Sequence, residues 1–305
     1  MSLKNWFKFL LLSFIWGTSF FWIKIGLQEA TPAMVVFFRV GFATLGLTLF
    51  TIISRKKFSL KKWWLYLFLG FFNVALPFLL ISWSEQHITS GMASVLNSTQ
   101  PLATALIASV FLKEERMTLR RAIGLVLGFA GVLILLSNRL SSGFSGQTLG
   151  IIATMVAVLG YGASAVFARL HNNDVSPTEQ ALGQMSFALL LITPAMVSID
   201  PSFVLPVRPV SYIAFAWLGL LGSFVASVIW YDLMQEIGPS RVSMTTYLLP
   251  LIGLLLGGLV LHEKVGWQLL VGGLLIILGI IIVNQRKTPL RPPASADFTI
   301  KESYE

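Results

Sequence analysis

The sequence predicts an all-α integral membrane protein whose ten transmembrane helices form two inverted five-helix repeats. The first observation is composition: of the 305 residues, 55% are hydrophobic and only 11% are charged, which is too much apolar surface for a water-soluble globule. The second is a succession of long apolar runs separated by short polar breaks. The third is a match between the two halves of the chain.

Ten apolar runs are long enough to cross a bilayer, which takes about 20 residues per helix. Proline marks two of the boundaries, because Pro32 opens the second run and Pro201 follows the end of the seventh. The first five predicted helices cover residues 6–26, 32–54, 64–82, 88–112 and 118–137. The second five cover residues 149–170, 178–199, 211–234, 239–261 and 267–284.

The distribution of positive charge predicts the orientation in the membrane. If the N-terminus lies in the cytoplasm, 17 of the 22 lysines and arginines fall on the cytoplasmic side, as the positive-inside rule requires. The net charge of +9 is therefore a topology signal and does not indicate nucleic-acid binding. We expect a multi-pass protein of the inner or plasma membrane, with both termini cytoplasmic. Residues 288–305 are polar and rich in proline, which predicts a disordered cytoplasmic tail.

The two halves of the chain match at nearly constant offsets, which predicts a first repeat at 1–140 and a second at 145–287. At an offset of 149 the matched pairs include Pro101 and Pro250, Glu114 and Glu263, and Gly124 and Gly273. At an offset of 145 they include Gly17 and Gly162, Ser19 and Ser164, and Lys24 and Arg169. Five crossings is an odd number, so the repeats must have opposite orientations. Inverted repeats are typical of carriers, which bind their solute near the midplane.

Two prolines inside apolar runs predict broken helices. A proline removes one backbone donor and frees the carbonyl four residues earlier. Pro101 and Pro250 each follow a polar turn, so we consider them candidates for helix breaks that take part in gating. The polar turns supply four candidate substrate-binding residues: Asn97, Gln100, Thr246 and Tyr247. The alternative is that these polar groups only repair the kinks and join neighbouring helices.

Further polar and aromatic residues are expected to face the same cavity. Aromatic faces beside hydrogen-bonding groups suit a small amphipathic organic solute. These candidates are Trp16 and Ser19 in the first helix, Asn73 in the third, Tyr161 and Ser164 in the sixth, and Trp230 in the eighth. For any single aromatic residue, packing or anchoring at the membrane interface is the alternative, and we favour it.

One arginine, Arg39, falls within a predicted crossing, where it costs about 2.5–3.5 kcal/mol to insert. It could attract a carboxylate or phosphate of the solute. It could instead snorkel to the outer surface or bind backbone carbonyls, and we favour this structural role. Glu263 lies at the end of a crossing and is expected to cap a helix or pair with Lys264. No carboxylate sits clearly mid-membrane, and Asp232, at the cytoplasmic end of the eighth helix, is the nearest candidate. A carboxylate proton relay of the usual pump type is therefore not supported.

Composition and residue spacing also argue against several kinds of metal, cofactor and catalytic site. The chain has no cysteine and its three histidines are dispersed, so we expect neither a metal site nor another cofactor. No phosphate-binding glycine loop or catalytic triad spacing is visible, and we expect no enzymatic activity. Glycine pairs at Gly124 and Gly128 allow close helix packing but are weak evidence for a dimer. The oligomeric state stays open, with a monomer possible.

The order of these residues resembles the drug/metabolite transporter superfamily, specifically its EamA-type branch with ten helices. The residues that carry the resemblance in the first half are Trp16, Gly17, Phe20, Phe38, Arg39, Ser90, Ala93, Pro101, Glu114, Arg116, Gly124 and Gly131. In the second half they are Pro239, Ser240, Arg241, Tyr247, Pro250, Gly257, Glu263 and Gly273. The resemblance implies transport of small metabolites, often amino acids and their relatives, through a central cavity between the repeats.

The sequence therefore predicts a secondary transporter or exporter of small organic metabolites that works by alternating access. Its expected partners are a small-molecule substrate and the lipid bilayer. One alternative is a membrane receptor or scaffold that does not transport, which needs no motif. A less favoured alternative is a membrane-embedded enzyme acting on lipid, which would need clustered acidic or metal-ligating residues.

Overall fold

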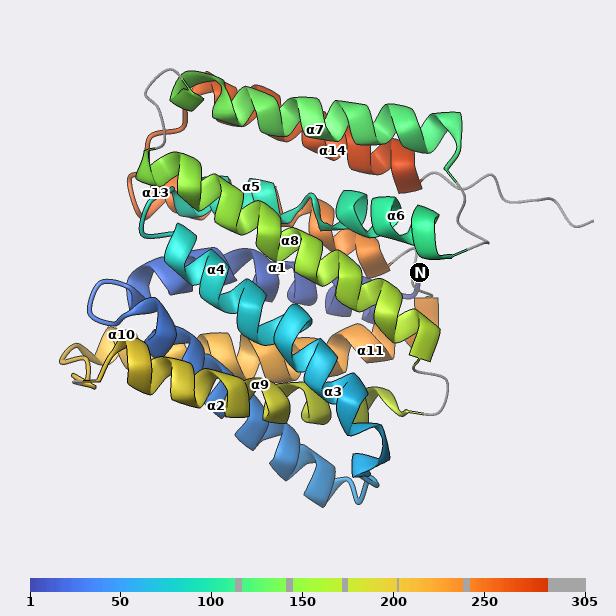
Figure 1. Cartoon of the computed structure of the whole chain (residues 1–305), viewed down its shortest axis with the longest axis vertical. Helices are drawn as coiled ribbons and strands as arrows, with labels where there is room; N and C mark the ends of the chain where they lie inside the picture. Colours follow the sequence, from blue (N-terminus) through green and yellow to red (C-terminus); the bar gives the residue numbers. More distant parts are fainter. Residues whose placement is uncertain (113–116, 141–144, 172–174, 202, 238–241, 285–305) are drawn as a thin grey trace, which may run out of the picture.

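The protein is an all-α membrane protein. The computed structural model describes residues 1–112, 117–140, 145–171, 175–201, 203–237 and 242–284, and this part of the chain contains helices and no strand. Eight of its helical segments are long and apolar enough to cross a membrane. They run roughly side by side, so that the bundle has two ends, and the N-terminus lies at the right-hand end in Figure 1. We call this the N-terminal end and the other the opposite end.

The helices follow one another with short connections. In the first half they are α1 (Leu3–Gly26), α2 (Pro32–Ile53), η1 (Leu60–Lys62), α3 (Trp63–Leu69), η2 (Gly70–Ala75), α4 (Leu76–Ser84), α5 (Ser90–Asn97), α6 (Gln100–Phe111) and α7 (Leu119–Leu140). In the second half they are α8 (Gly146–His171), α9 (Pro177–Ile199), α10 (Pro209–Ala216), η4 (Trp217–Val225), α11 (Ala226–Ile237), η5 (Ser243–Tyr247), α13 (Leu249–Leu259) and α14 (Trp267–Asn284).

Local sequence explains where two of the long helices begin. Thr31 caps α2 by accepting a hydrogen bond from the Met34 amide, and Pro32 occupies the first turn. Ser176 and Pro177 start α9 in the same way. A hydroxyl cap satisfies an amide that has no partner in the helix, and proline tolerates the first turn because it needs no donor there. The two starts are 145 residues apart, the offset found between the first and sixth helices of the sequence.

Two crossings contain a π-helix in their middle. Leu60–Ser84 includes the π-helix η2, and Pro209–Met234 includes the π-helix η4. In each, a glycine lets the helix backbone approach a neighbour: a Cβ on Gly70 would lie 2.9 Å from the Gln184 carbonyl oxygen, and a Cβ on Gly219 would lie 2.7 Å from that of Arg39. Gly219 follows Gly70 by 149 residues. A π-helix breaks the regular hydrogen-bond pattern and is frequent at functional sites.

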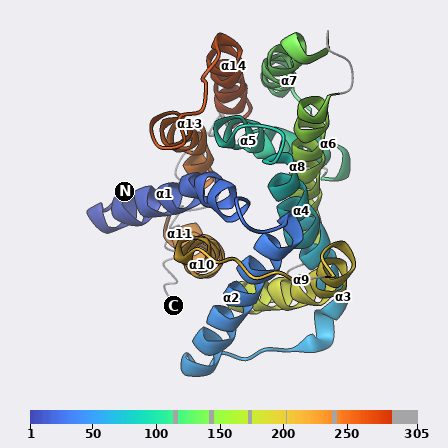
Figure 2. The same cartoon turned by 90° about the vertical axis from the view of Figure 1, so that its left-hand side faces the viewer.

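Packing partners repeat between the two halves of the chain. Helix α1 packs against α13, as α8 packs against α6, and α2 packs against η4, as α9 packs against η2. Helices α7 and α14 lie side by side at the top of both views, along one edge of the bundle (Figures 1 and 2). Glycines bring this pair together, because a Cβ on Gly131 would lie 2.5 Å from the Gly272 carbonyl oxygen.

Two kinds of sequence prediction remain: long helices that the structure shows to be interrupted, and features of residues that it does not describe. The fourth and ninth predicted helices do not form single long helices, because each is interrupted within the polar turn before its proline. The predicted tail at 288–305 and Glu114, the residue matched to Glu263, lie outside the described residues.

Candidate substrate site

The first helix break places a buried amide inside the bundle. Helix α5 ends at Asn97 and α6 begins at Gln100, with Pro101 in its first turn. The hydroxyls of Ser98 and Thr99 donate to the carbonyls of Val95 and Leu96 at 2.7 and 2.6 Å, so they repair the end of α5. The Oδ1 atom of Asn97 is buried and has no hydrogen-bond partner in the described part of the chain. Asn97 therefore keeps an acceptor that a solute could use.

The second break follows the same plan. The 3-10 helix η5 covers Ser243–Tyr247, and α13 starts two residues later with Pro250 in its first turn. Thr245 donates its hydroxyl to the Val242 carbonyl at 2.8 Å. Thr246 is 8% exposed. The hydroxyl of Tyr247 accepts a 2.7 Å hydrogen bond from Asn284 in α14, so Tyr247 also ties two helices together.

Arg39 is the charged residue of the interior site. It lies on α2, is buried, and its Nε–H donates to the Ser223 Oγ on η4 at 3.1 Å. Its guanidinium carbon lies 3.7 Å from the centre of the Phe78 ring on α4, a cation–π distance. The expectation that Arg39 snorkels to the surface or binds backbone carbonyls is wrong, since its partners are a hydroxyl and a ring. Within the described residues the guanidinium makes one hydrogen bond, so further donors remain for an anionic group.

A neutral pair occupies the corresponding place in the other half. Asn73 on η2 donates its amide to the Gln184 Oε1 on α9 at 3.0 Å. Gln184 follows Arg39 by 145 residues, and each bonds a polar side chain on the π-helix of the other half. The Asn73 donor is thus engaged in joining two helices, which is the structural interpretation of this residue.

Trp16 and Trp230, which the sequence predicts to face a solute, lie where α1 contacts η4 and α11. The Trp16 indole donates to the Gly222 carbonyl of η4 at 3.2 Å, and its ring centre lies 5.2 Å from that of Trp230. Ser19 is buried and donates to the Ile15 carbonyl at 3.1 Å. Trp16 and Arg39 therefore form hydrogen bonds to consecutive residues of η4, Gly222 and Ser223.

The other predicted residues have structural partners or packing roles. Tyr161 on α8 packs against the main apolar core. Ser164 is buried and donates to the Gly160 carbonyl at 2.9 Å. Gln100 is partly buried at the start of α6, and its carbonyl accepts a hydrogen bond from Thr104 at 2.9 Å. Tyr161 lies close enough to Arg39 for the two side chains to interact electrostatically, whereas no contact within the described residues joins Ser164 or Gln100 to Arg39.

Charged contacts of α1 tie it to different elements at its two ends. At the N-terminal end Lys8 pairs with Asp232, and also with Glu236 at 3.2 Å, both on α11. At the opposite end the Lys24 ammonium donates to the carbonyls of Glu85 and, at 3.0 Å, Ile88. These contacts hold the two ends of α1 against different neighbours.

Glu263 caps α5 at the opposite end of the bundle. Its carboxylate accepts hydrogen bonds from the Ser90 amide and hydroxyl, both at 2.9 Å, and from the Gly91 amide at 3.2 Å. A carboxylate at a helix N-terminus satisfies free amides and stabilises the helix dipole. The predicted capping role of Glu263 is confirmed, with a cap that is distant in sequence.

The EamA-like transporter family model matches this chain over residues 5–137 and 148–285. The chain belongs to this family. The two matched ranges together cover the described helices on both sides of the middle connection, and family members are transporters by name.

Curated relatives of this EamA-family chain extend over nearly all of it. It is 27% identical over 276 residues to the uncharacterized transporter YoaV of Bacillus subtilis, covering 89% of this chain and 93% of YoaV. It is 23% identical over 287 residues to the uncharacterized inner membrane transporter YedA of Escherichia coli, covering 92% and 91% of the two chains. A solved crystal structure shares the fold with a TM-score of 0.65 at 17% identity, over 92% of this chain and 96% of the other.

One residue of this EamA-family protein escaped the sequence reasoning. Glu85 follows α4 directly and is 0% exposed, and neither of its carboxylate oxygens has a hydrogen-bond partner in the described part of the chain. Its position in the polar stretch 82–90 predicts an ordinary connection, where acidic residues are solvated. No sequence signal marks it, because the charged residues that interact with it, Lys24, Arg39 and Glu263, are distant in sequence.

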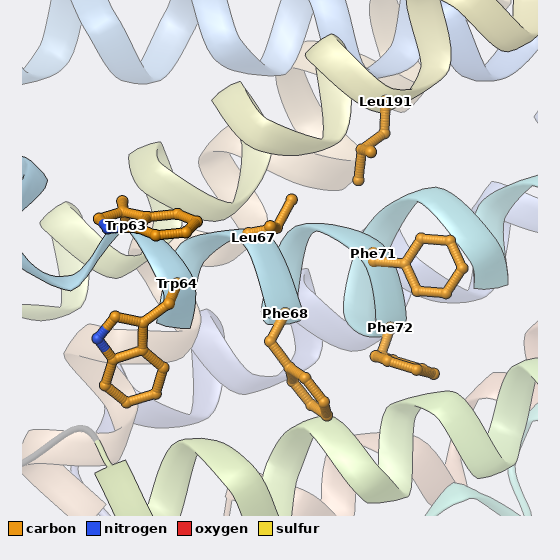
Figure 3. Close-up of a pocket in the computed structure, with 7 residues that line it drawn as sticks. All are labelled: Trp63, Trp64, Leu67, Phe68, Phe71, Phe72 and Leu191. Atoms are coloured by element: carbon orange, nitrogen blue, oxygen red, sulfur yellow. The ribbon is translucent and has the colours of Figure 1, made fainter.

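Two hollows of the EamA-family chain lie away from the predicted substrate residues. One, of about 360 Å³, is an apolar groove along α3 and η2, lined by aromatic residues and closed on one side by Leu191 of α9 (Figure 3). The other, of about 250 Å³, lies at the opposite end of the bundle and is lined by residues that include Lys24, His87 and Glu263. None of the predicted substrate-binding residues lines either of them.

Proposed function

We propose that this protein carries a small organic metabolite across the membrane by alternating access, with amino acids and related compounds as the substrate class. The observation that carries the proposal is that Arg39 and Trp16, which packs beside Trp230, form hydrogen bonds to consecutive residues of the buried π-helix η4. A guanidinium beside flat aromatic faces suits a solute with an acidic group and an apolar part. The free acceptor of Asn97 supplies a further contact for a solute amine or hydroxyl.

We further propose that the protein crosses the membrane ten times as two inverted repeats. Matched π-helices, matched proline breaks and repeating packing partners support this architecture. In such carriers one repeat rocks against the other around a fixed site. In this scheme the contacts of Lys8 break when the bundle opens at the N-terminal end, and the contacts of Lys24 break when it opens at the opposite end.

Cysteine labelling tests the inverted architecture cleanly, because the chain has no cysteine of its own. We expect a membrane-impermeant maleimide applied to intact cells to label Lys264→Cys and not Lys113→Cys. Permeabilised cells should expose Lys113→Cys as well, which serves as the control for reactivity. Labelling of both positions from the same face would contradict the inverted repeats.

Flux in proteoliposomes tests the function. We expect purified protein to exchange radiolabelled L-phenylalanine, L-leucine, L-threonine or L-glutamate against unlabelled internal pools of the same amino acid. Liposomes that contain the heat-denatured protein are the control for leakage. Correctly inserted protein that binds a compound of the panel and moves none of it would instead identify a receptor.

A further inference from the structure

The carboxyl group of Glu85 is the ionisable group of the interior that the proposed substrate contacts do not use. It lies directly after the last turn of α4, has no exposed surface, and has no hydrogen bond on either oxygen within the described residues. A buried ionised carboxylate without hydrogen bonds is very unfavourable, and such a group takes up a proton instead. Burial raises the pKa of Glu85 well above its ordinary value of 4.5.

Charged groups surround Glu85 from several elements. Lys24 on α1 and Arg39 on α2 favour its ionised form, and Glu263 before α14 opposes it. The Lys24 ammonium donates to the backbone carbonyl of Glu85 itself, so a positive charge already stands beside the carboxyl group. The neighbouring His87 contacts the Trp83 carbonyl through its Nδ1 at 3.1 Å. Tyr161 on α8 interacts electrostatically with Arg39. Lys24 could therefore balance the carboxylate as soon as water reaches it.

A hollow that water can fill is lined by residues next to Glu85. The hollow of about 250 Å³ at the opposite end of the bundle is lined by Lys24, Gln86 and His87, which flank Glu85 in space or in sequence. Glu85 itself lies behind this lining with no exposed surface. A movement of Lys24 away from the two carbonyls that it holds would join the carboxyl group to the hollow.

We propose that Glu85 is a proton-binding site that couples proton movement to the transport cycle, an inference that rests on the proposed function. In the closed conformation the carboxyl group is neutral and keeps its proton. When the bundle opens at the Lys24 end, the carboxyl O–H bond breaks and the proton passes to a water molecule of the hollow. The resulting carboxylate pairs with the Lys24 ammonium. When the bundle instead opens at the N-terminal end, water from that side returns a proton to the carboxylate and Lys24 is released, so that one proton has moved from one side of the membrane to the other.

A proton gradient across proteoliposomes tests the coupling. With the amino acid of the flux panel that exchanges fastest, we expect an imposed pH difference to drive net accumulation by the native protein. Glu85→Gln keeps the shape of the protonated side chain but cannot release a proton, so accumulation should fall about tenfold or more while exchange at equal pH persists. Glu85→Asp should restore gradient-driven accumulation. Glu29→Gln alters a carboxylate between α1 and α2 that accepts a hydrogen bond from Ser211, and it is the matched control. Compared at equal amounts of folded protein, it should accumulate the amino acid as the native protein does.

Thermal unfolding at different pH values gives a readout that does not need a substrate. In the unfolded chain Glu85 loses its proton as the pH rises through about 4.5, whereas in the folded protein it keeps it, so its contribution to stability falls as the pH rises. The melting temperature of Glu85→Gln should therefore exceed that of the native protein near neutral pH, with the gain vanishing in acid. Glu29 has the opposite sign, because the hydrogen bond from Ser211 lowers its pKa. Glu29→Gln should lose stability at neutral pH.

The possible results of these experiments distinguish a failure of the proton coupling from a failure of the proposed transport function. Native protein that exchanges substrate but ignores the pH gradient overturns the coupling and leaves the transport function standing. Gradient-driven accumulation that survives in Glu85→Gln, or identical melting profiles of Glu85→Gln and native protein across pH, also overturns it. Failure of all exchange, together with the expected melting profiles, would instead count against the proposed function and would remove the coupling with it.

Discussion

Gly131→Leu is expected to abolish most of the folded protein. A Cβ at this position would lie 2.5 Å from the Gly272 carbonyl oxygen and 2.9 Å from the Ile276 side chain. The nearest obstacle is backbone on a packed helix and cannot turn aside, so α7 must move away from α14. Overpacking costs about 1–3 kcal/mol and more where the backbone must shift. Size-exclusion chromatography and thermal unfolding of the detergent-solubilised variant measure the loss.

Gly41→Ala is the matched control for this substitution. Gly41 also lies within a long helix, α2, but a Cβ there would meet nothing within 4 Å. The change should leave the folded yield unaltered and can raise stability, because alanine in a helix is favoured over glycine by about 0.5–1 kcal/mol. Equal losses at Gly131 and Gly41 would contradict the close α7–α14 contact.

Arg39→Met is expected to lower exchange of a substrate that carries a carboxylate by about tenfold or more, since tenfold corresponds to about 1.4 kcal/mol. Methionine keeps an apolar chain of similar length over Phe78 but removes the guanidinium. Ser223 retains its 3.0 Å hydrogen bond to the Leu218 carbonyl, so no hydroxyl is left unpaired. Because replacing a buried charge by an apolar group is often neutral for stability, the folded yield should change little.

Exchange of the L-amino acids and of their carboxamides distinguishes this role from a structural one. Arg39→Met should slow exchange of the amino acids and reduce their preference over the carboxamides. Arg208→Met is the control, because this arginine is 66% exposed and pairs with Glu29 at 3.6 Å. A parallel loss of folded protein and exchange in Arg39→Met, with the preference unchanged, would show that Arg39 only holds α2 against η4.

Local chemistry made much of the fold predictable from the sequence. Pro32 begins a helix because of its ring, and Pro101 and Pro250 start new helices after polar turns. Glu263 was predicted to cap or pair because a carboxylate at the end of an apolar run needs donors, and free amides supply them. These features depend on a few neighbouring residues or on one strong chemical preference.

The interior site was less predictable, because its contacts join residues far apart in the chain. Arg39 and Ser223 are separated by 184 residues, and nothing in either neighbourhood points to the other. The π-helices could not be read from apolar composition, since α and π turns use the same residues. Glu85 lies in a polar connection that resembles any other, yet in the folded chain it is fully buried and interacts with charges distant in sequence.

The matched positions Arg39 and Gln184 differ in one respect, because the first is a cation and the second is neutral. Two identical halves would give a carrier the same free energy whether it opened inwards or outwards. A single guanidinium on one half makes the two open states unequal in energy. An anionic solute therefore experiences a different electrostatic potential when it enters from each side. In the proposed carrier this imbalance shifts the populations of the inward-open and outward-open states, while the net direction of transport is set by the gradients of the solute and of any coupled ion.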